Sequence, residues 1–326
     1  MDMLATTGFR ELTPEHILDG VEKMLDRPLS NLCRPMNSYI NRVYELADTE
    51  GSGFMVKFYR PGRWTREALL EEHRFLLELA EEEVPVIAPL PLADQGTLGE
   101  LAGYYFALFP KKGGRFLDEF SEEQWVQLGH LLGRTHLLGA CGRAPHRPVM
   151  RPDLLTAKQV AMVCASGLLP KDIAVEFARL CDNLINRIAP LFTGARLQRI
   201  HGDCHFGNII YRPGEGFVLI DFDDMATGPP IQDIWMLLPG PPEDCARELA
   251  LLLEGYVTFQ PFDHSSMLLI EPLRAMRFIH YIAWCTHQVL EDGRTQVAPD
   301  FGSRRYWQQE LADLADQLMR IDKMSG

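Results

Sequence analysis

The chain has 326 residues, which is long for one domain, so two lobes are expected. Hydrophobic residues make up 46% and charged residues 24%, a balance typical of a globular protein with a sizeable core. The net charge of -13 argues against non-specific binding to nucleic acid or to an anionic membrane, because both require a basic surface. We therefore expect no nucleic-acid partner and no membrane partner.

The seven cysteines are scattered and form no C-x-x-C pair, which favours reduced thiols in a cytoplasmic protein. The first residues, MDMLATTGFRELTPEH, show no basic segment followed by an apolar one. No uncharged apolar run is long enough to predict a membrane span. The sequence leaves the oligomeric state open, with a monomer favoured.

The N-terminal part predicts a helix followed by a hairpin. Thr13 and Pro14 suit the cap and first position of a helix that runs to about Leu25. Two strand-like runs follow, residues 38–46 and 54–59, with a Gly-Ser-Gly turn between them. This pattern indicates a mainly antiparallel sheet.

Lys57 and Glu72 are expected to face one another. Lys57 lies in the second strand-like run, on a face otherwise lined by apolar groups. In the helix predicted over residues 65–82, Glu72 falls near the middle of the apolar stripe and Glu71 at its margin. A carboxylate there is costly unless it is paired, and Lys57 is the nearest upstream candidate. The pair has the order found in kinases; a structural ion pair or two surface charges are the alternatives.

A lobe boundary is expected near residues 110–116, where Lys-Lys-Gly-Gly interrupts the pattern after two more strand-like runs. It divides the chain into an N-terminal lobe, 1–110, and a C-terminal lobe, 111–326; in a kinase-like arrangement the first would bind the nucleotide, and the second would hold the catalytic groups and bind the acceptor. In a kinase-like arrangement, backbone groups around Phe109 to Lys111 would meet the adenine edge. The alternative is a solvated linker.

The second lobe is expected to be predominantly helical. Ser121 and Gln124 form a plausible capping box for its first helix. The loop of residues 143–152 carries three arginines, for which we favour a solvated loop over a phosphate-binding or acidic-substrate patch. Asp233 lies near the start of a buried helix, where it suits a cap. Further helices are predicted over residues 171–189, 243–259, 266–290 and 305–319.

Residues 199–224, RIHGDCHFGNIIYRPGEGFVLIDFDD, hold the candidate catalytic groups. Asp203 and Asn208 belong to an H-x-D-x-x-x-x-N spacing, and Asp221 ends an apolar run. An aspartate on a loop can accept a hydroxyl proton, while an asparagine and a second aspartate can supply oxygen ligands to Mg²⁺. The alternative is a transition-metal hydrolase site built on His201, Asp203 and His205, although no second His/Cys cluster supports it.

These motifs resemble the aminoglycoside phosphotransferase and choline kinase branch of the protein-kinase-like superfamily. IHGDCHFGN followed by IDFDD is diagnostic of the superfamily. The stretches PMNSYINRVY, VKFYRPGRW, LLEEH, GPPIQDIWMLL and IEPLRAMR also resemble a family of bacterial stress-response Ser/Thr protein kinases. The resemblance covers nearly the whole chain. It implies an α+β, two-lobed protein-kinase-like fold, with an antiparallel sheet and helix in the N-lobe and a larger, mainly helical C-lobe.

The resemblance also implies the site. Asp203 would be the catalytic base, Asn208 and Asp221 the Mg²⁺ ligands, and Lys57 the lysine that contacts the phosphates of ATP. Glu72 would be the partner of Lys57, and Ser38 would approach the phosphates. The departures are a Pro-Met-Asn-Ser-Tyr turn where a glycine-rich loop is usual, and Asp-Phe-Asp where Asp-Phe-Gly is usual, with no room for an activation segment.

The leading hypothesis is an ATP- and Mg²⁺-dependent kinase that phosphorylates a hydroxyl, a Ser/Thr of a protein and possibly its own. The missing activation segment keeps a second hypothesis open, transfer to a small hydroxyl acceptor such as an aminoglycoside, choline or a sugar. A third is a non-catalytic, pseudokinase-like ATP sensor. The complete set of catalytic and metal-binding candidates argues against it.

Overall fold

The computed structural model describes residues 9, 11–38 and 40–324. The chain forms two compact units. One is drawn from residues 1–147, 201–225 and 236–261, and the other from residues 148–200, 226–235 and 262–326. The predicted boundary near residues 110–116 divides the chain by function and stays a prediction.

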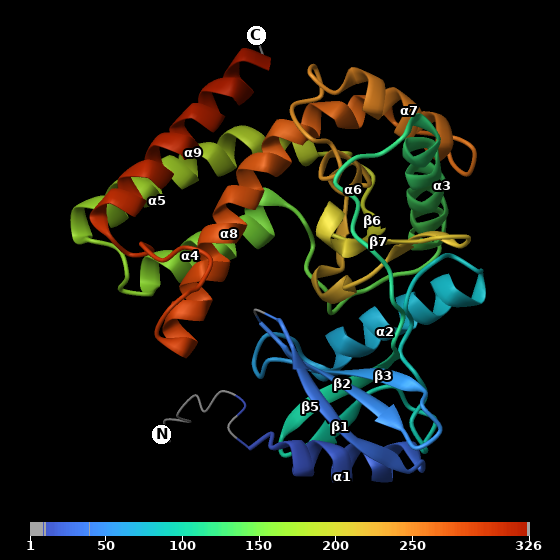
Figure 1. Cartoon of the computed structure of the whole chain (residues 1–326). Coiled ribbons are helices and arrows are strands. Elements are labelled where there is room, and N and C mark those ends of the chain that lie inside the picture. The colour runs from blue at the N-terminus through green and yellow to red at the C-terminus, as the bar shows by residue number, and fades with distance from the viewer. Residues whose placement is uncertain (1–8, 10, 39, 325–326) are drawn as a thin grey trace. The chain divides into compact units, whose positions relative to one another are not determined.

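The first unit contains a five-stranded antiparallel sheet with the order β1-β2-β3-β5-β4 (Figure 1). The predicted hairpin is present as β2 and β3, and the edge strand β1 was not anticipated. Its residues are mostly exposed, so they carry little of the apolar alternation that marks a strand. The strands are β1 (Leu29–Met36), β2 (Arg42–Asp48), β3 (Gly53–Phe58), β4 (Gly99–Leu101) and β5 (Tyr104–Pro110).

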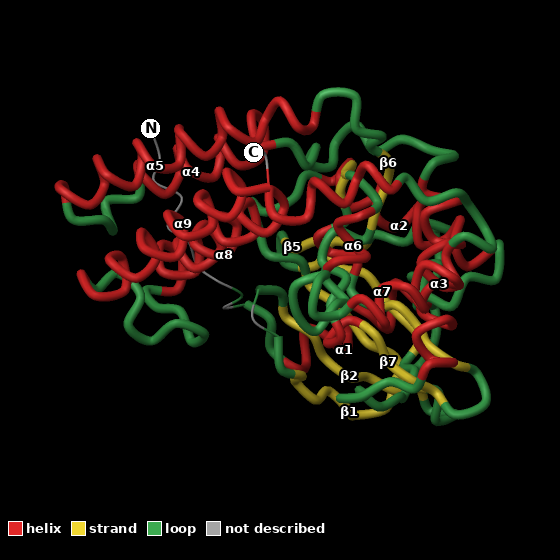
Figure 2. Tube along the Cα trace, turned by 90° about the horizontal axis from the view of Figure 1, so that it is seen from above, coloured by secondary structure: helices red, strands yellow, loops and turns green. Residues whose placement is uncertain are grey.

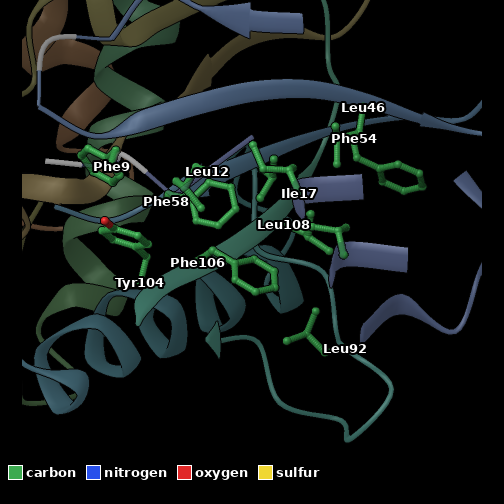
Figure 3. Close-up of a cluster of buried hydrophobic side chains, with 12 residues drawn as sticks. Phe9, Leu12, Ile17, Leu46, Phe54, Phe58, Leu92, Tyr104, Phe106 and Leu108 are labelled. Carbon is green, nitrogen blue, oxygen red and sulfur yellow. The ribbon is translucent and has the colours of Figure 1, made fainter. Parts of the chain in front are cut away.

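One face of this sheet packs against α1 (Pro14–Leu25). Thr13 caps the helix as predicted, since its side chain accepts a hydrogen bond from the backbone of His16. The cluster between helix and sheet joins Ile17 of α1 to Phe58 of β3 and Phe106 of β5 (Figure 3). Alternate residues of β3 point to this core, so the residues between them point to the other face.

The other face carries α2 (Arg66–Glu81), which Thr65 caps through a hydrogen bond from the Ala68 amide. Leu69 of α2 packs on Tyr59 and Ala107. Because Lys57 is two residues from Tyr59 and pairs with Ala107 in the sheet register, its side chain points toward α2. The strand and the helix thereby place Lys57 beside the buried face that carries Glu72.

The rest of the first unit is built on a close helix pair and a hairpin. The predicted capping box of Ser121 and Gln124 starts α3 (Glu122–Gly139), which packs on α7 (Ala246–Tyr256). Glycine is required at this contact, since a Cβ on Gly129 would lie 2.0 Å from the carbonyl oxygen of Leu252. The hairpin consists of β7 (Ile209–Arg212) and β8 (Gly216–Leu219).

The second unit is mainly helical. With α3 and α7 of the first unit, it makes the part of the chain after residue 110 predominantly helical, as predicted. Helices α4, α5, α8 and α9 contact one another and run side by side in Figures 1 and 2. A π-helical turn over Pro152–Thr156 and the helix α4 that follows it were not anticipated. The elements are α4 (Ala157–Ala165), α5 (Lys171–Ile188), β6 (Gln198–Ile200), β9 (Ala226–Gly228), α6 (Ile231–Trp235), α8 (Ile270–Asp292) and α9 (Arg304–Met324).

The predicted α+β fold class is confirmed by the antiparallel sheet of the first unit and the helical second unit. Within the described residues, no helix combines the length and apolar character needed to cross a membrane. All seven cysteines have free thiols, as their spacing indicated.

Candidate active site

The β7–β8 hairpin brings Asn208 and Asp221 together. Ile209 pairs with Leu219, and the backbone amide of Ile220 donates to the carbonyl of Asn208 over 3.0 Å. Asn208 therefore precedes one strand and Asp221 follows the other, at the same end of the hairpin. Asp221 has a φ of 59°, in the left-handed region that few residues other than glycine adopt. Aspartate tolerates this region better than most residues do, so the sharp turn after the strand suits Asp221.

His201 holds the loop that carries Asp203 through two hydrogen bonds. The buried His201 ring donates through Nε2 to the carbonyl of Ile220 over 2.9 Å, and its Nδ1 accepts from the amide of Asp203 over 3.3 Å. Asn208 Nδ2 in turn donates to the carbonyl of Asp203 over 2.9 Å. Asp203 and the two metal-ligand candidates are thus coupled through the backbone of one hairpin and one loop.

The transition-metal alternative does not fit this geometry. Both ring nitrogens of His201 are used in the loop, and His205 accepts a backbone hydrogen bond from Gly207 over 3.0 Å. Within the described ranges, no group of three or more His, Cys, Asp or Glu side chains is placed to hold a metal ion. The two histidines shape the loop.

Lys57 lies among three carboxylates. Its Nζ is 3.0 Å from Asp221 Oδ1, 3.2 Å from Asp223 Oδ1 and 4.0 Å from Glu72 Oε1. The predicted contact with Glu72 is therefore present, but it is the longest of the three. Lys57 and Glu72 are both buried, whereas the Asp221 side chain is 54% exposed and faces solvent.

Burial and ion pairing act against each other in this cluster. Burial disfavours the charge on Lys57, yet Asp221, Asp223 and Glu72 outweigh it and raise the pKa of Lys57 well above its ordinary value. Burial raises the pKa of Glu72 to about 7, against the opposing effect of Lys57. Burial would also raise the pKa of Asp223, but Arg63, Lys57 and Arg147 hold it well below its ordinary range. Asp223 is thus the carboxylate that Arg63, Lys57 and Arg147 together keep ionised.

Two arginines complete the cluster, and the sequence did not identify either of them as part of it. Arg63 Nη1 lies 2.6 Å from Asp223 Oδ2, and its Nη2 donates to Asp224 Oδ1 over 2.7 Å. Arg147 was expected in a solvated loop, and this prediction is wrong, because its guanidinium is fully buried against Glu72. No local pattern separates Arg147 from Arg143, which is exposed as expected.

The three nucleotide-binding candidates outside this cluster are placed as follows. Ser38 lies in the connection between β1 and β2 and is half-buried. Phe109 is on the same sheet face as Lys57, edge-on to the ring of His73. The Lys111 amide donates to the carbonyl of Gly53 over 3.0 Å, and Lys111 Nζ pairs with Glu45 at 2.6 Å. Their roles toward ATP stay predictions.

Comparison with known proteins identifies the family. A family model described as the phosphotransferase enzyme family matches residues 33–270. The chain belongs to this family. Over 310 residues, this phosphotransferase is 38% identical to stress response kinase A of Shigella flexneri, covering 95% of the chain and 93% of the relative. It is 37% identical over 318 residues to the serine/threonine protein kinase RdoA of Salmonella typhimurium, with the same coverage.

Solved structures agree on the fold. Amicoumacin kinase hAmiN, in complex with AMP-PNP, Ca²⁺ and Ami, superposes with a TM-score of 0.76 and covers 95% of this phosphotransferase and 94% of its own chain. The two sequences are 17% identical, so this likeness establishes the kinase-like fold alone. The family and fold inferred from the HGDCHFGN and IDFDD motifs are thereby confirmed.

The donor set suits Mg²⁺. Asn208 uses its amide nitrogen to bind the Asp203 carbonyl, so its oxygen is the atom that can meet a cation. Asp221 adds an exposed carboxylate. Two protein oxygens are a small set, which fits a cation that keeps several waters and also binds substrate phosphates.

Proposed function

We propose that this phosphotransferase transfers the γ-phosphoryl group of ATP to a hydroxyl, with Mg²⁺ held by Asn208 and Asp221. The observation that carries the proposal is the contact of Lys57 Nζ with Asp221 at 3.0 Å, at the end of a hairpin that also holds Asn208 and the Asp203 loop. A buried lysine beside an exposed carboxylate suits adjacent phosphates and their cation.

Each residue has a distinct part in the proposed reaction. Lys57 would hold the α- and β-phosphates, and Ser38 with the backbone near Phe109 and Lys111 would hold the remainder of the nucleotide. Asp203 would orient the acceptor hydroxyl and take its proton as the oxygen attacks the γ-phosphorus in line. When bound, Mg²⁺ supplies positive charge that offsets the charge developing on the phosphate oxygens.

For the acceptor, we propose the Ser or Thr hydroxyl of a protein, possibly of the chain itself, in the cytoplasm. The full-length similarity to a relative named a serine/threonine protein kinase supports this choice. A small hydroxyl acceptor is the second candidate. One observation supports this second candidate: only a few residues separate Asp224 from Gly228, where a protein kinase of the usual kind has its activation segment.

The test is turnover of ATP labelled in its γ-phosphate, with the chain alone, with a Ser/Thr peptide library, and with a panel of aminoglycosides and amino alcohols. Acid-stable, alkali-labile label on peptide or protein supports the protein acceptor, and label on a panel compound supports the second candidate. Asp203→Asn and Asp221→Ala should each lower turnover by at least about 100-fold, since each removes a group that acts on the reacting atoms.

Two outcomes would contradict the proposal. Folded Asp203→Asn and Asp221→Ala variants with wild-type turnover would show that these residues do not do the chemistry. Nucleotide binding without turnover on any acceptor would favour the non-catalytic sensor. Elemental analysis of the purified protein adds a check on the cation, because tightly bound zinc or iron would contradict a Mg²⁺ enzyme.

A further inference from the structure

Arg147 contacts three separate parts of the first unit. Its Nε donates to the carbonyl of Met225 over 2.8 Å, and its Nη2 donates to the carbonyl of Asp223. Its Nη1 lies 3.6 Å from Glu72 Oε2, and its Cζ lies over the Trp64 ring, 4.0 Å from the ring centroid. One side chain thus links helix α2 to the loop that follows Asp221.

This contact matters because Glu72 is deeply buried. The Glu72 side chain is 1% exposed and that of Arg147 is 0% exposed. Neither Glu72 Oε2 nor Arg147 Nη1 makes a hydrogen bond to any of the described residues, so their approach to one another offsets their burial. Arg147 is nearer to Glu72 than Lys57 is, at 3.6 Å against 4.0 Å.

Nucleotide binding would change the charge balance around Lys57. If Lys57 holds phosphates and Asp221 holds the cation, the contacts of Lys57 with Asp221 and Asp223 weaken. Asp223 would still have Arg63, which lies 2.6 Å from it in this structure, and Glu72 would still have Arg147. The two arginines would therefore remain as counter-charges and would allow Lys57 to turn to a ligand without leaving a buried carboxylate unpaired.

Only an arginine suits this position. The planar guanidinium can donate to two carbonyls and face a carboxylate at the same time, whereas a lysine ammonium is a single point of charge on a flexible stem. The cation–π contact with Trp64 further holds the guanidinium in place.

We propose that Arg147 is a positioning residue that holds Glu72 and the metal-binding loop in their active arrangement before nucleotide binds. The proposal rests on the proposed function, since it concerns the cation site at Asp221. In this proposal an unmodified arginine orders the loop that follows Asp221. No activation segment takes part, because the sequence has no room for one. Because the Arg147 side chain is fully buried, it would act through Asp223 and Glu72.

The test measures binding of a fluorescent ADP analogue, with Mg²⁺ and with chelator, to the wild type and to Arg147→Gly. In the variant, the tightening of nucleotide binding by Mg²⁺ should fall by about 10- to 100-fold, the usual effect of losing a group that orients a metal ligand. Binding in chelator should fall much less, because no cation is then bound and Glu72 keeps Lys57 beside it at 4.0 Å. Millimolar guanidinium should restore the Mg²⁺ effect by filling the space left by the side chain.

Arg143→Ala is the matched control, because it removes an exposed arginine from the same loop and should leave both affinities unchanged. Arg147→Lys covers the case in which Arg147→Gly does not fold. It keeps a charge near Glu72 but cannot make both carbonyl contacts, so it should fold and still lose much of the Mg²⁺ effect. A wild-type Mg²⁺ effect in folded Arg147→Lys would overturn the proposal.

Equal loss of binding with Mg²⁺ and with chelator, unaffected by guanidinium, would also overturn the positioning role, because a purely structural residue would have this effect.

The proposed function and the positioning role can fail separately. If the wild type phosphorylates no acceptor but Arg147→Gly loses the Mg²⁺ effect, phosphoryl transfer fails and the positioning role stands. If the wild type turns over ATP and Arg147→Gly keeps the full Mg²⁺ effect, the positioning role alone fails.

Discussion

Replacing Lys57 by Met should destabilise the protein by an amount that the surrounding charges determine. Met keeps the aliphatic volume and removes the cation. At an effective dielectric constant of about 20, the Coulomb energy is ~5 kcal/mol at the 3.2 Å distance to Asp223 and ~4 kcal/mol at the 4.0 Å distance to Glu72. Asp221 adds little, because its carboxylate is 54% exposed and solvent screens it.

The net loss should be smaller than these energies, because each buried carboxylate keeps an arginine. Asp223 retains Arg63 and Glu72 retains Arg147. We therefore expect a loss of about 3 kcal/mol, the lower end of the range for breaking a buried ion pair. At roughly 2 °C per kcal/mol for a large protein, the unfolding temperature should fall by about 6 °C.

The destabilisation by Lys57→Met should also depend on pH. Burial raises the pKa of Glu72 to about 7, and Lys57 opposes that rise, so the variant should have a still higher Glu72 pKa. A carboxyl with a raised folded-state pKa binds a proton more readily when folded, so it reduces stability as pH increases through that pKa. The difference between variant and wild type should be largest near pH 8 and smaller near pH 6.

The assay is thermal and denaturant unfolding of Lys57→Met at pH 6, 7 and 8, beside Lys112→Met as a control that removes an exposed lysine. The control should stay within about 0.5 kcal/mol of wild type. A Lys57→Met variant as stable as the control, or one whose deficit grows toward pH 6, would refute the account of Lys57 as the shared counter-ion.

Two further predictions concern the framework around the site. Burial, and then Lys57 and Arg147, lower the pKa of His73 to about 3, so the unfolded chain binds the extra proton below about pH 6.5 and stability falls as pH decreases. Relative to His73→Gln, the wild type should lose about 2 kcal/mol between pH 7.5 and 5, and parallel pH profiles in denaturant unfolding would exclude this role. Gly129→Ala should cost about 3 kcal/mol by separating α3 from α7, whereas Gly113→Ala, where a Cβ meets open space, should be nearly neutral; equal unfolding midpoints would contradict the packing argument.

Local chemistry accounts for what the sequence predicted correctly. The caps at Thr13 and Ser121 were predicted because each involves residues no more than three positions apart. The edge strand β1 and the helix α4 were missed because their apolar patterns are weak; most of β1 is exposed, and α4 continues from a π-helical turn.

The candidate site was likewise predictable from the sequence only in part. The sequence alone grouped Asp203, Asn208 and Asp221 as candidates, because a motif and the strand after it contain all three within a short segment. It could not determine that Lys57 approaches Asp221, 164 residues away, more closely than it approaches Glu72.

Only the tertiary structure revealed that Arg147 is buried. Its carbonyl contact with Asp223 spans 76 residues, and its sequence surroundings are those of an ordinary arginine-rich loop. Whether such an arginine is solvated or buried depends on a carboxylate and two carbonyls that other elements bring to it. The balance between the burial of Arg147 and its ionic contacts is a property of the folded chain, because burial strengthens the interactions that solvent would otherwise screen.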